Sequence, residues 1–269
     1  MFSRLMLILV VGSIGIGRVA SQATVVDAGQ SPTSVLADSI FNAAAGGNQD
    51  AWRAAVSEIQ ILASTAPTEA KLPALLGALY LRLEERDSAR ATLERATRMD
   101  TTLAAAYFAL GRVHLELRDK PDDAIKQFEA AIRADSTYAD AHAQLGLAYQ
   151  IKGKRRLARR HSDRAIRYEP RLALPYRILA ETYAEDENRA ASLIYFKRYL
   201  DRNPDDQKTA YTFSLKLLEE EEWEQLFEVT SRLDDTLALP LLATSLIHKG
   251  EHEAAQAAFQ DYIATLEPE

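Results

Sequence analysis

A short pattern of small and large residues recurs about every 34 positions from near residue 36 to the end of the chain. The small residues that begin successive copies are Gly77, Gly111, Gly146, Ala180, Ser214 and Ala243. The intervals between them are 34, 35, 34, 34 and 29 positions, so the last copy is shorter than the others. A period of this length is typical of a stacked helical array, in which each repeat is one pair of helices.

Each copy of the pattern has two halves with the spacing of a helix. A second small residue follows twelve positions after the first, as Ala89 follows Gly77 and Ser192 follows Ala180. Four positions later most copies have a large apolar residue, and these are Leu93, Phe128, Phe196 and Phe259. Apolar residues within each half recur at intervals of three and four, the period of an α-helix. We therefore expect pairs of antiparallel helices whose small residues let the two backbones approach closely.

These repeats resemble the tetratricopeptide repeat family. The resemblance is strongest in the second to fifth repeats and weaker around Ser214, where Ala210 and Thr230 replace larger residues. It implies an all-α fold, an α-solenoid of about six to seven helix-turn-helix repeats that wind into a right-handed superhelix. Stacking is required because a lone helix pair cannot bury its own apolar face. The array is expected over residues 34–269, with repeats near 36–69, 70–103, 104–138, 139–172, 173–206, 207–235 and 236–269.

The N-terminus is predicted to be a secretory signal peptide over residues 1–23. Arg4 gives a positive start, and an apolar run follows from Leu5 to Ile16. Ser21-Gln22-Ala23 fits a small-residue cleavage site. The alternative is an uncleaved anchor, but the run is shorter than the roughly 18 residues that a membrane span needs. We expect a periplasmic or secreted protein, assuming a bacterial host, and a flexible leader over residues 24–33.

The mature chain would be acidic and has no cysteine. Removal of residues 1–23 leaves 30 basic and 39 acidic residues, a net charge of −9. This balance argues against a nucleic-acid partner. Export permits disulfides, yet none can form, so stability has to come from stacking. The absence of cysteine also excludes a bacterial lipid anchor and sulfur-ligated metal sites.

No motif for catalysis or for a cofactor stands out. There is no glycine-rich phosphate loop after a strand, and no serine has the context of a catalytic triad. His248 and His252 are four positions apart, but the turn at Gly250 separates them, so no metal pair is expected. His114 and His142 occupy positions that are usually aromatic, and we expect both to be packed. We therefore expect no catalytic residue, no metal and no cofactor.

The family resemblance also implies that the first helix of each repeat lines a concave groove. Outward-facing positions on these helices carry apolar residues, with cations beside them, where a solvated face would be polar. These predicted groove residues are Phe108, Arg112, Leu147, Arg177 and Tyr211. Aromatic and arginine side chains are common anchors of protein interfaces, so we predict a scaffold or adaptor that binds a partner peptide or protein there. The alternative is that these residues pack within and between repeats.

A second surface is predicted in the fourth repeat, where residues 152–171 are strongly basic. Arg156, Arg160, Arg164 and Arg167 lie at intervals of four, four and three and form one stripe on the convex side. One interpretation is a docking patch for an anionic surface, such as membrane headgroups or an acidic partner. The alternative is a solvated face that Glu and Asp residues of adjacent repeats neutralise.

The last repeat suggests a different function. Its second helix has a broad apolar surface that includes Phe259, Tyr262 and Ile263. No polar capping helix follows, although such arrays normally need one for solubility. A structural subunit that forms homo-oligomers through this end is therefore the alternative to a groove-binding adaptor.

Overall fold

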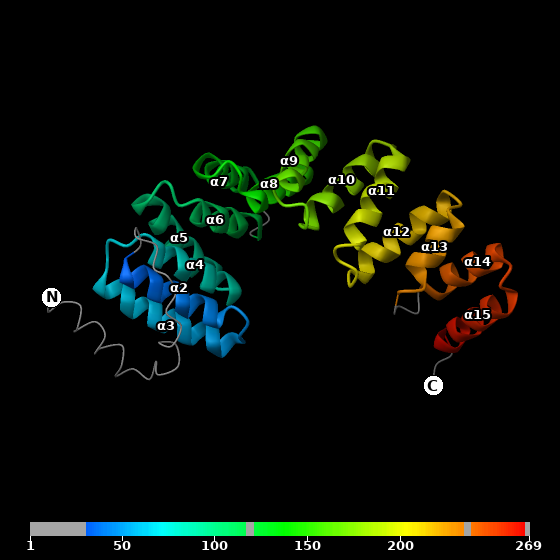
Figure 1. Ribbon diagram of the computed structural model, residues 1–269, viewed down its shortest axis with the longest axis horizontal. Coiled ribbons are helices and arrows are strands. Elements are labelled where there is room, and N and C mark those ends of the chain that lie inside the picture. The colour runs from blue at the N-terminus through cyan, green and yellow to red at the C-terminus, as the bar shows by residue number, and fades with distance from the viewer. Residues whose placement is uncertain (1–30, 117–120, 234–237, 267–269) are drawn as a thin grey trace. The chain divides into compact units, whose positions relative to one another are not determined.

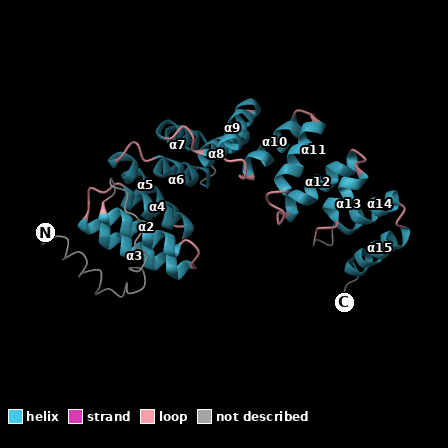
Figure 2. Cartoon of the chain, in the orientation of Figure 1, coloured by secondary structure: helices cyan, strands magenta, loops and turns pink. Residues whose placement is uncertain are grey.

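The computed structural model describes residues 31–116, 121–233 and 238–266 (Figure 1). Within these ranges every long element is an α-helix and no strand occurs (Figure 2), which confirms the predicted all-α class. None of the described helices is both long enough and apolar enough to cross a membrane. The predicted signal peptide, residues 1–23, lies outside the described residues and stays a prediction. The chain divides into two compact units, Met1–Asp135 and Ser136–Glu269, which we call unit 1 and unit 2.

The described part of unit 1 contains three helix pairs. They are α2 (Pro32–Ala44) with α3 (Gln49–Thr65), α4 (Lys71–Arg82) with α5 (Arg86–Met99), and α6 (Ala104–Glu116) with α7 (Pro121–Ala134). The side chain of Ser31 caps α2 by accepting a hydrogen bond from the Ser34 N–H at 3.1 Å. Pro32 fits the first turn because no intrahelical partner exists there for the N–H that it lacks. The helix thus begins inside the segment that was predicted as a leader.

Four helix pairs make up the described residues of unit 2. They are α8 (Ala139–Ile151) with α9 (Arg155–Tyr168), α10 (Leu174–Glu185) with α11 (Arg189–Leu200), α12 (Gln207–Glu219) with α13 (Trp223–Thr230), and α14 (Leu239–Lys249) with α15 (His252–Leu266). Each of the four turns contains one residue with positive φ: Gly153, Glu187, Glu221 and Gly250. In unit 2 the turn of every pair therefore contains a residue in the left-handed conformation, whether or not that residue is glycine.

The small residues of the repeat allow close helix approach, as predicted. A Cβ added to Gly77 would lie 2.3 Å from Cγ of Leu93, and one added to Gly111 would lie 2.6 Å from Cε1 of Phe128. Leu93 and Phe128 are fully buried. In these two pairs the first helix therefore offers bare backbone at the point where the second helix inserts a large side chain.

The first helices lie on the inner side of each stack. In unit 1 the contacts between successive first helices join α2 with α4 and α4 with α6; in unit 2 they join α8 with α10 and α12 with α14. Second helices instead pack against the first helix that follows them, as α5 does against α6 and α9 against α10. First helices that contact one another directly place their remaining free face on the inside of the stack. All five predicted groove residues belong to first helices.

Candidate partner-binding surfaces

Unit 1 presents Phe108 and Arg112 one turn apart on α6. Phe108 is half-buried, and its ring centroid lies 6.0 Å from that of Phe128 on α7, so it packs within its own repeat. Arg112 is exposed, and its Nη2 lies 3.8 Å from Oε1 of Glu116. Glu116 also accepts a hydrogen bond from Nε of Arg86 at 3.4 Å. Phe108 thus partly fits the packing alternative, whereas Arg112 keeps an accessible guanidinium.

Unit 2 presents Leu147 on α8, Arg177 on α10 and Tyr211 on α12, all half-buried. Tyr211 packs against a buried cluster that includes Phe213. One turn further along α12, Leu215 is 39 % exposed. Leu215 was not among the predicted anchors, although its spacing from Tyr211 places both on the same helix face.

Arg177 interacts electrostatically with Asp206, the residue that precedes α12. Burial by itself would raise the pKa of Asp206, but hydrogen bonds from Tyr199 and Thr209, together with the charge of Arg177, hold it below its ordinary value. Thr209 donates through Oγ1 to Oδ2 of Asp206 at 2.7 Å. The positive charge of Arg177 therefore acts on a carboxylate at the start of α12.

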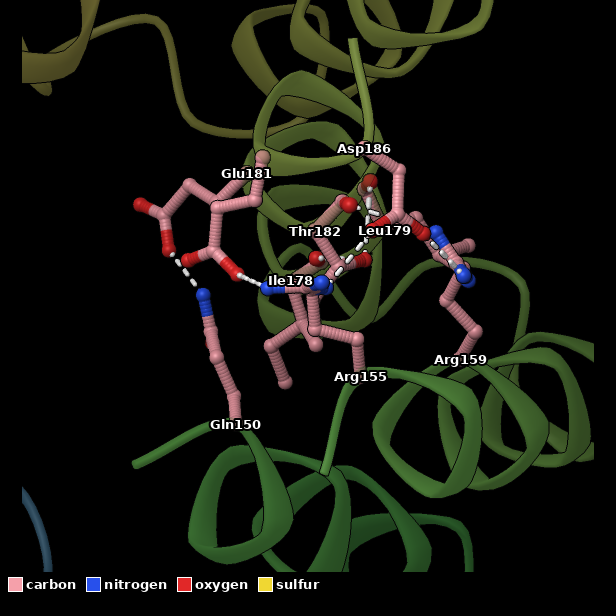
Figure 3. Close-up of polar contacts among 9 residues, drawn as sticks. Gln150, Arg155, Arg159, Ile178, Leu179, Glu181, Thr182 and Asp186 are labelled. Atoms are coloured by element: carbon pink, nitrogen blue, oxygen red, sulfur yellow. Dashed lines mark hydrogen bonds and ion pairs between the residues drawn. The ribbon is translucent and has the colours of Figure 1, made fainter. Parts of the chain in front are cut away.

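Two arginines of α9 join the fourth repeat to the fifth (Figure 3). Nε of Arg155 lies 2.6 Å from Oδ1 of Asp186, and Nη2 of Arg159 lies 2.5 Å from Oδ2 of the same carboxylate. Arg159 also donates through Nη1 to the carbonyl of Thr182 at 3.2 Å. Hydrogen bonding from Arg159 lowers the pKa of Asp186. On α8, the Gln150 side chain donates to Oε2 of Glu181 at 2.7 Å, a second polar link between these repeats.

The predicted basic stripe is a different set of arginines on the same helix. Arg156, Arg160, Arg164 and Arg167 are all exposed, and none forms an ion pair with a described residue. The charges of adjacent repeats thus neutralise Arg155 and Arg159 and leave the stripe unpaired. Asp163, the only acidic residue of α9, lies at the edge of the stripe, where it interacts electrostatically with Arg167 and Arg159.

Comparison with known proteins identifies the repeat. The family model for the tetratricopeptide repeat matches residues 74–102, the second helix pair of unit 1. Residues 74–102 therefore match a tetratricopeptide repeat, and the array as a whole has the fold of such repeats. No curated protein matches it.

Solved structures show the same all-α tetratricopeptide solenoid. MamA is 25 % identical over 59 % of this chain and 92 % of its own, with a TM-score of 0.52. PilW, described as a type IV pilus biogenesis factor, is 19 % identical over 81 % of this chain and 100 % of its own, with a TM-score of 0.65. YrrB, described as a tetratricopeptide-repeat protein with an unusual peptide-binding site, is 18 % identical over 75 % and 97 %, with a TM-score of 0.53. Tetratricopeptide arrays are in general non-catalytic scaffolds for protein–protein interaction, since stacking creates extended binding surfaces.

The fourth tetratricopeptide repeat departs from the pattern where its two helices meet. Ser162 stands where Leu93 and Phe128 stand in earlier repeats, and it is fully buried. Its Oγ has no hydrogen-bond partner among the described atoms. A Cβ on Gly146 would lie 2.9 Å from this oxygen, so the close approach of the helices is kept with a smaller side chain.

A histidine pair is buried in this same tetratricopeptide repeat. His142 on α8 and His161 on α9 are 1 % and 6 % exposed, and their Nδ1 atoms are 3.1 Å apart. Only one of these nitrogens carries the proton, because the other must accept it. Burial, together with the charges of His142, Arg160 and Arg164, lowers the pKa of His161 from 6.5 to about 4. Burial also lowers the pKa of His142.

The packing expected of His142 and His114 is confirmed, since both are buried. The partner of His142 was missed. The sequence did contain a signal for it. At Ser162 the pattern of large residues is broken, and the residue before it is His161. Among the described residues, no group of three or more histidine, aspartate or glutamate side chains is arranged to hold a metal ion.

Proposed function

We propose that this protein is a non-catalytic scaffold that binds a peptide segment of a partner protein on the inner face of unit 2. The observation that carries the proposal is the pair Tyr211 and Leu215 on α12, apolar side chains one turn apart, of which Tyr211 is partly accessible and Leu215 is exposed. Leu147 and Arg177 provide a further apolar group and a cation on the first helices of the two preceding repeats. A partly buried apolar patch with an adjacent arginine is the usual composition of an interface hot spot. Phe108 and Arg112 provide a smaller site of the same kind in unit 1.

A double substitution on the inner face tests the proposal. We expect the variant Arg177→Gln with Leu215→Ser to bind peptides selected against the wild-type protein about 30-fold more weakly, because it removes one charged and one apolar anchor. The matched control is Arg198→Gln with Ile194→Ser on α11, a second helix, where both residues are exposed. Affinities would be measured by fluorescence polarisation with peptides from a random displayed library. Equal affinity of the two variants would rule out this inner face as the binding surface.

Self-association is a second candidate function, and the exposed apolar residues of α15 favour it. Phe259 is 37 % exposed and Ile263, one turn away, is 53 % exposed. Neighbouring exposed side chains of this size are typical of an interaction surface. The contact would join two copies of the chain.

Sedimentation velocity at tens of micromolar protein separates this candidate from a monomeric scaffold. If α15 forms the contact, the wild-type protein sediments as an oligomer and the variant Phe259→Ser with Ile263→Ser as a monomer, because the buried apolar area is lost. The control Ile151→Ser with Ile194→Ser alters two other exposed isoleucines and should sediment like the wild type. Self-association through α15 is rejected if the wild-type protein is already monomeric. It is also rejected if the variant has the same mass in solution as the wild type.

A further inference from the structure

Helix α9 separates its arginines into two functional groups. Six arginines and one acidic residue, Asp163, lie on this helix. Arg155 and Arg159 are held by Asp186. The other four, Arg156, Arg160, Arg164 and Arg167, are exposed and have no ion pair with any described residue. We call these four the α9 arginine row.

The row lies on the outer surface of unit 2. It occupies the side of α9 opposite the buried residues Ala158, Ser162 and Ala165. Eleven residues of helix separate its ends, so its four guanidinium groups extend over about 16 Å. Since α9 is a second helix, the row is distinct from the inner face that Leu147, Arg177 and Tyr211 occupy.

We infer that the α9 arginine row binds a run of acidic side chains in a partner protein. Guanidinium groups pair with carboxylates through two parallel hydrogen bonds, which a lysine cannot form. Successive arginines lie about one helical turn apart, roughly 6 Å. Alternate residues of an extended strand lie at nearly the same spacing, about 6.6 Å, so consecutive arginines can each meet a carboxylate.

The surface next to the row also favours an anion. A shallow hollow lies at the N-terminal end of the row, beside Arg156. Its lining includes Lys154, Arg155 and Arg159, and the only acidic residue in it is Asp186, which those two arginines already bind. An acidic segment that follows the row therefore meets the further positive charge of Lys154 at this end.

The shape and charge of the molecule favour a peptide over a membrane. The row is one side chain wide on a single helix, which also carries Asp163 and the exposed ring of Tyr168. A lipid surface is flat, so it would also approach the acidic groups of neighbouring helices. The whole chain carries a net charge of −7, which an anionic bilayer repels. A linear acidic segment contacts the row alone.

The test compares two variants with the same net charge. The row variant is Arg156→Gln, Arg160→Gln, Arg164→Gln and Arg167→Gln. The control variant is Arg53→Gln, Arg95→Gln, Arg133→Gln and Lys208→Gln, four exposed cations on α3, α5, α7 and α12. The probes are a fluorescent peptide of eight glutamates, the matching peptide of eight glutamines, and phosphatidylcholine vesicles with a third of phosphatidylserine.

We expect the wild-type protein to bind the glutamate peptide and not the glutamine peptide at low salt. The row variant should lose about 20-fold in affinity, since four exposed ion pairs are removed, and the control variant should change by less than about twofold. Binding should weaken as salt approaches about 0.1 M, where exposed charges are screened beyond roughly 10 Å.

Three outcomes with the peptides would overturn the inference. The wild-type protein could bind both peptides alike, the control variant could lose as much affinity as the row variant, or the row variant could bind as the wild type does. A fourth outcome, row-dependent binding to the vesicles without binding to the glutamate peptide, would assign the row to lipid and reject a protein partner.

Two half variants keep the test valid even if the fourfold variant folds poorly. They are Arg156→Gln with Arg160→Gln and Arg164→Gln with Arg167→Gln, and each should lose about fivefold in affinity. Loss of the row leaves the inner face intact, so this test and that of the proposed function can fail separately.

Discussion

Valine in place of Gly77 is expected to lower the free energy of unfolding by about 3 kcal/mol, one of the two largest effects that the structure predicts. A Cβ at this position would lie 2.3 Å from Cγ and 2.6 Å from Cδ2 of Leu93. Leu93 is fully buried, so its side chain has no free space to enter, and α5 must move away from α4. In an unpacked helix the loss of a glycine would instead be mildly favourable.

The neighbouring substitution Ala78→Val provides the control. Ala78 is half-buried on the same turn of α4, so valine there has a similar backbone effect and no collision with Leu93. Urea unfolding followed by circular dichroism would measure both variants. A difference of less than about 1 kcal/mol between them would mean that the contact between Gly77 and Leu93 is looser than the structure shows.

The second large effect is a loss of stability in mild acid, caused by His161. In the unfolded chain this histidine takes up a proton near its usual pKa of 6.5, whereas in the folded protein burial and neighbouring charges hold the pKa at about 4. The unfolded state therefore binds more protons between these values. The stabilising contribution is complete above pH 6.5 and is lost as the pH falls toward 4, with a total of about 3 kcal/mol.

The double variant His142→Phe with His161→Phe removes both titrating groups and keeps rings in the buried space. Its free energy of unfolding should change much less than that of the wild type between pH 6.5 and 4.5. Asp186 and Asp206 also have lowered pKa values, but their unfolded value is near 3.8, so their contribution is lost mainly below this window. An equally steep acid dependence in the double variant would show that other groups cause it.

The sequence was sufficient to predict the elements that depend on local period. Close helix pairs are predicted by a small residue on one helix and a large one on the other, as in Gly77 with Leu93 and Gly111 with Phe128. The structure confirms both contacts. The reason is that each contact lies within one repeat, between residues at a fixed separation. Thr230 shows the limit of this rule: it replaces the usual large residue, is buried, and satisfies its hydroxyl by donating to the Leu226 carbonyl.

The surfaces were harder to predict, because exposure depends on the neighbouring repeat. The sequence proposed Phe108 and Arg177 as anchors, but it could not show that Phe108 packs on Phe128 or that the charge of Arg177 acts on Asp206. From the sequence, the arginines of α9 could either pair with acidic residues of adjacent repeats or remain exposed. The positions of Asp186, Glu185 and the Thr182 carbonyl separate the paired arginines from the α9 arginine row.

The double contact of Arg155 and Arg159 with Asp186 has a consequence for how the array can change its length. A linear array can gain or lose a whole repeat with little disturbance, because each repeat contacts only its neighbours. A cut between the fourth and fifth repeats would separate both arginines from their shared carboxylate and Arg155 from Glu185, so four charged side chains would lose a partner. These two repeats are therefore coupled by their charges, and the 34-residue period overstates how freely one can be exchanged without the other.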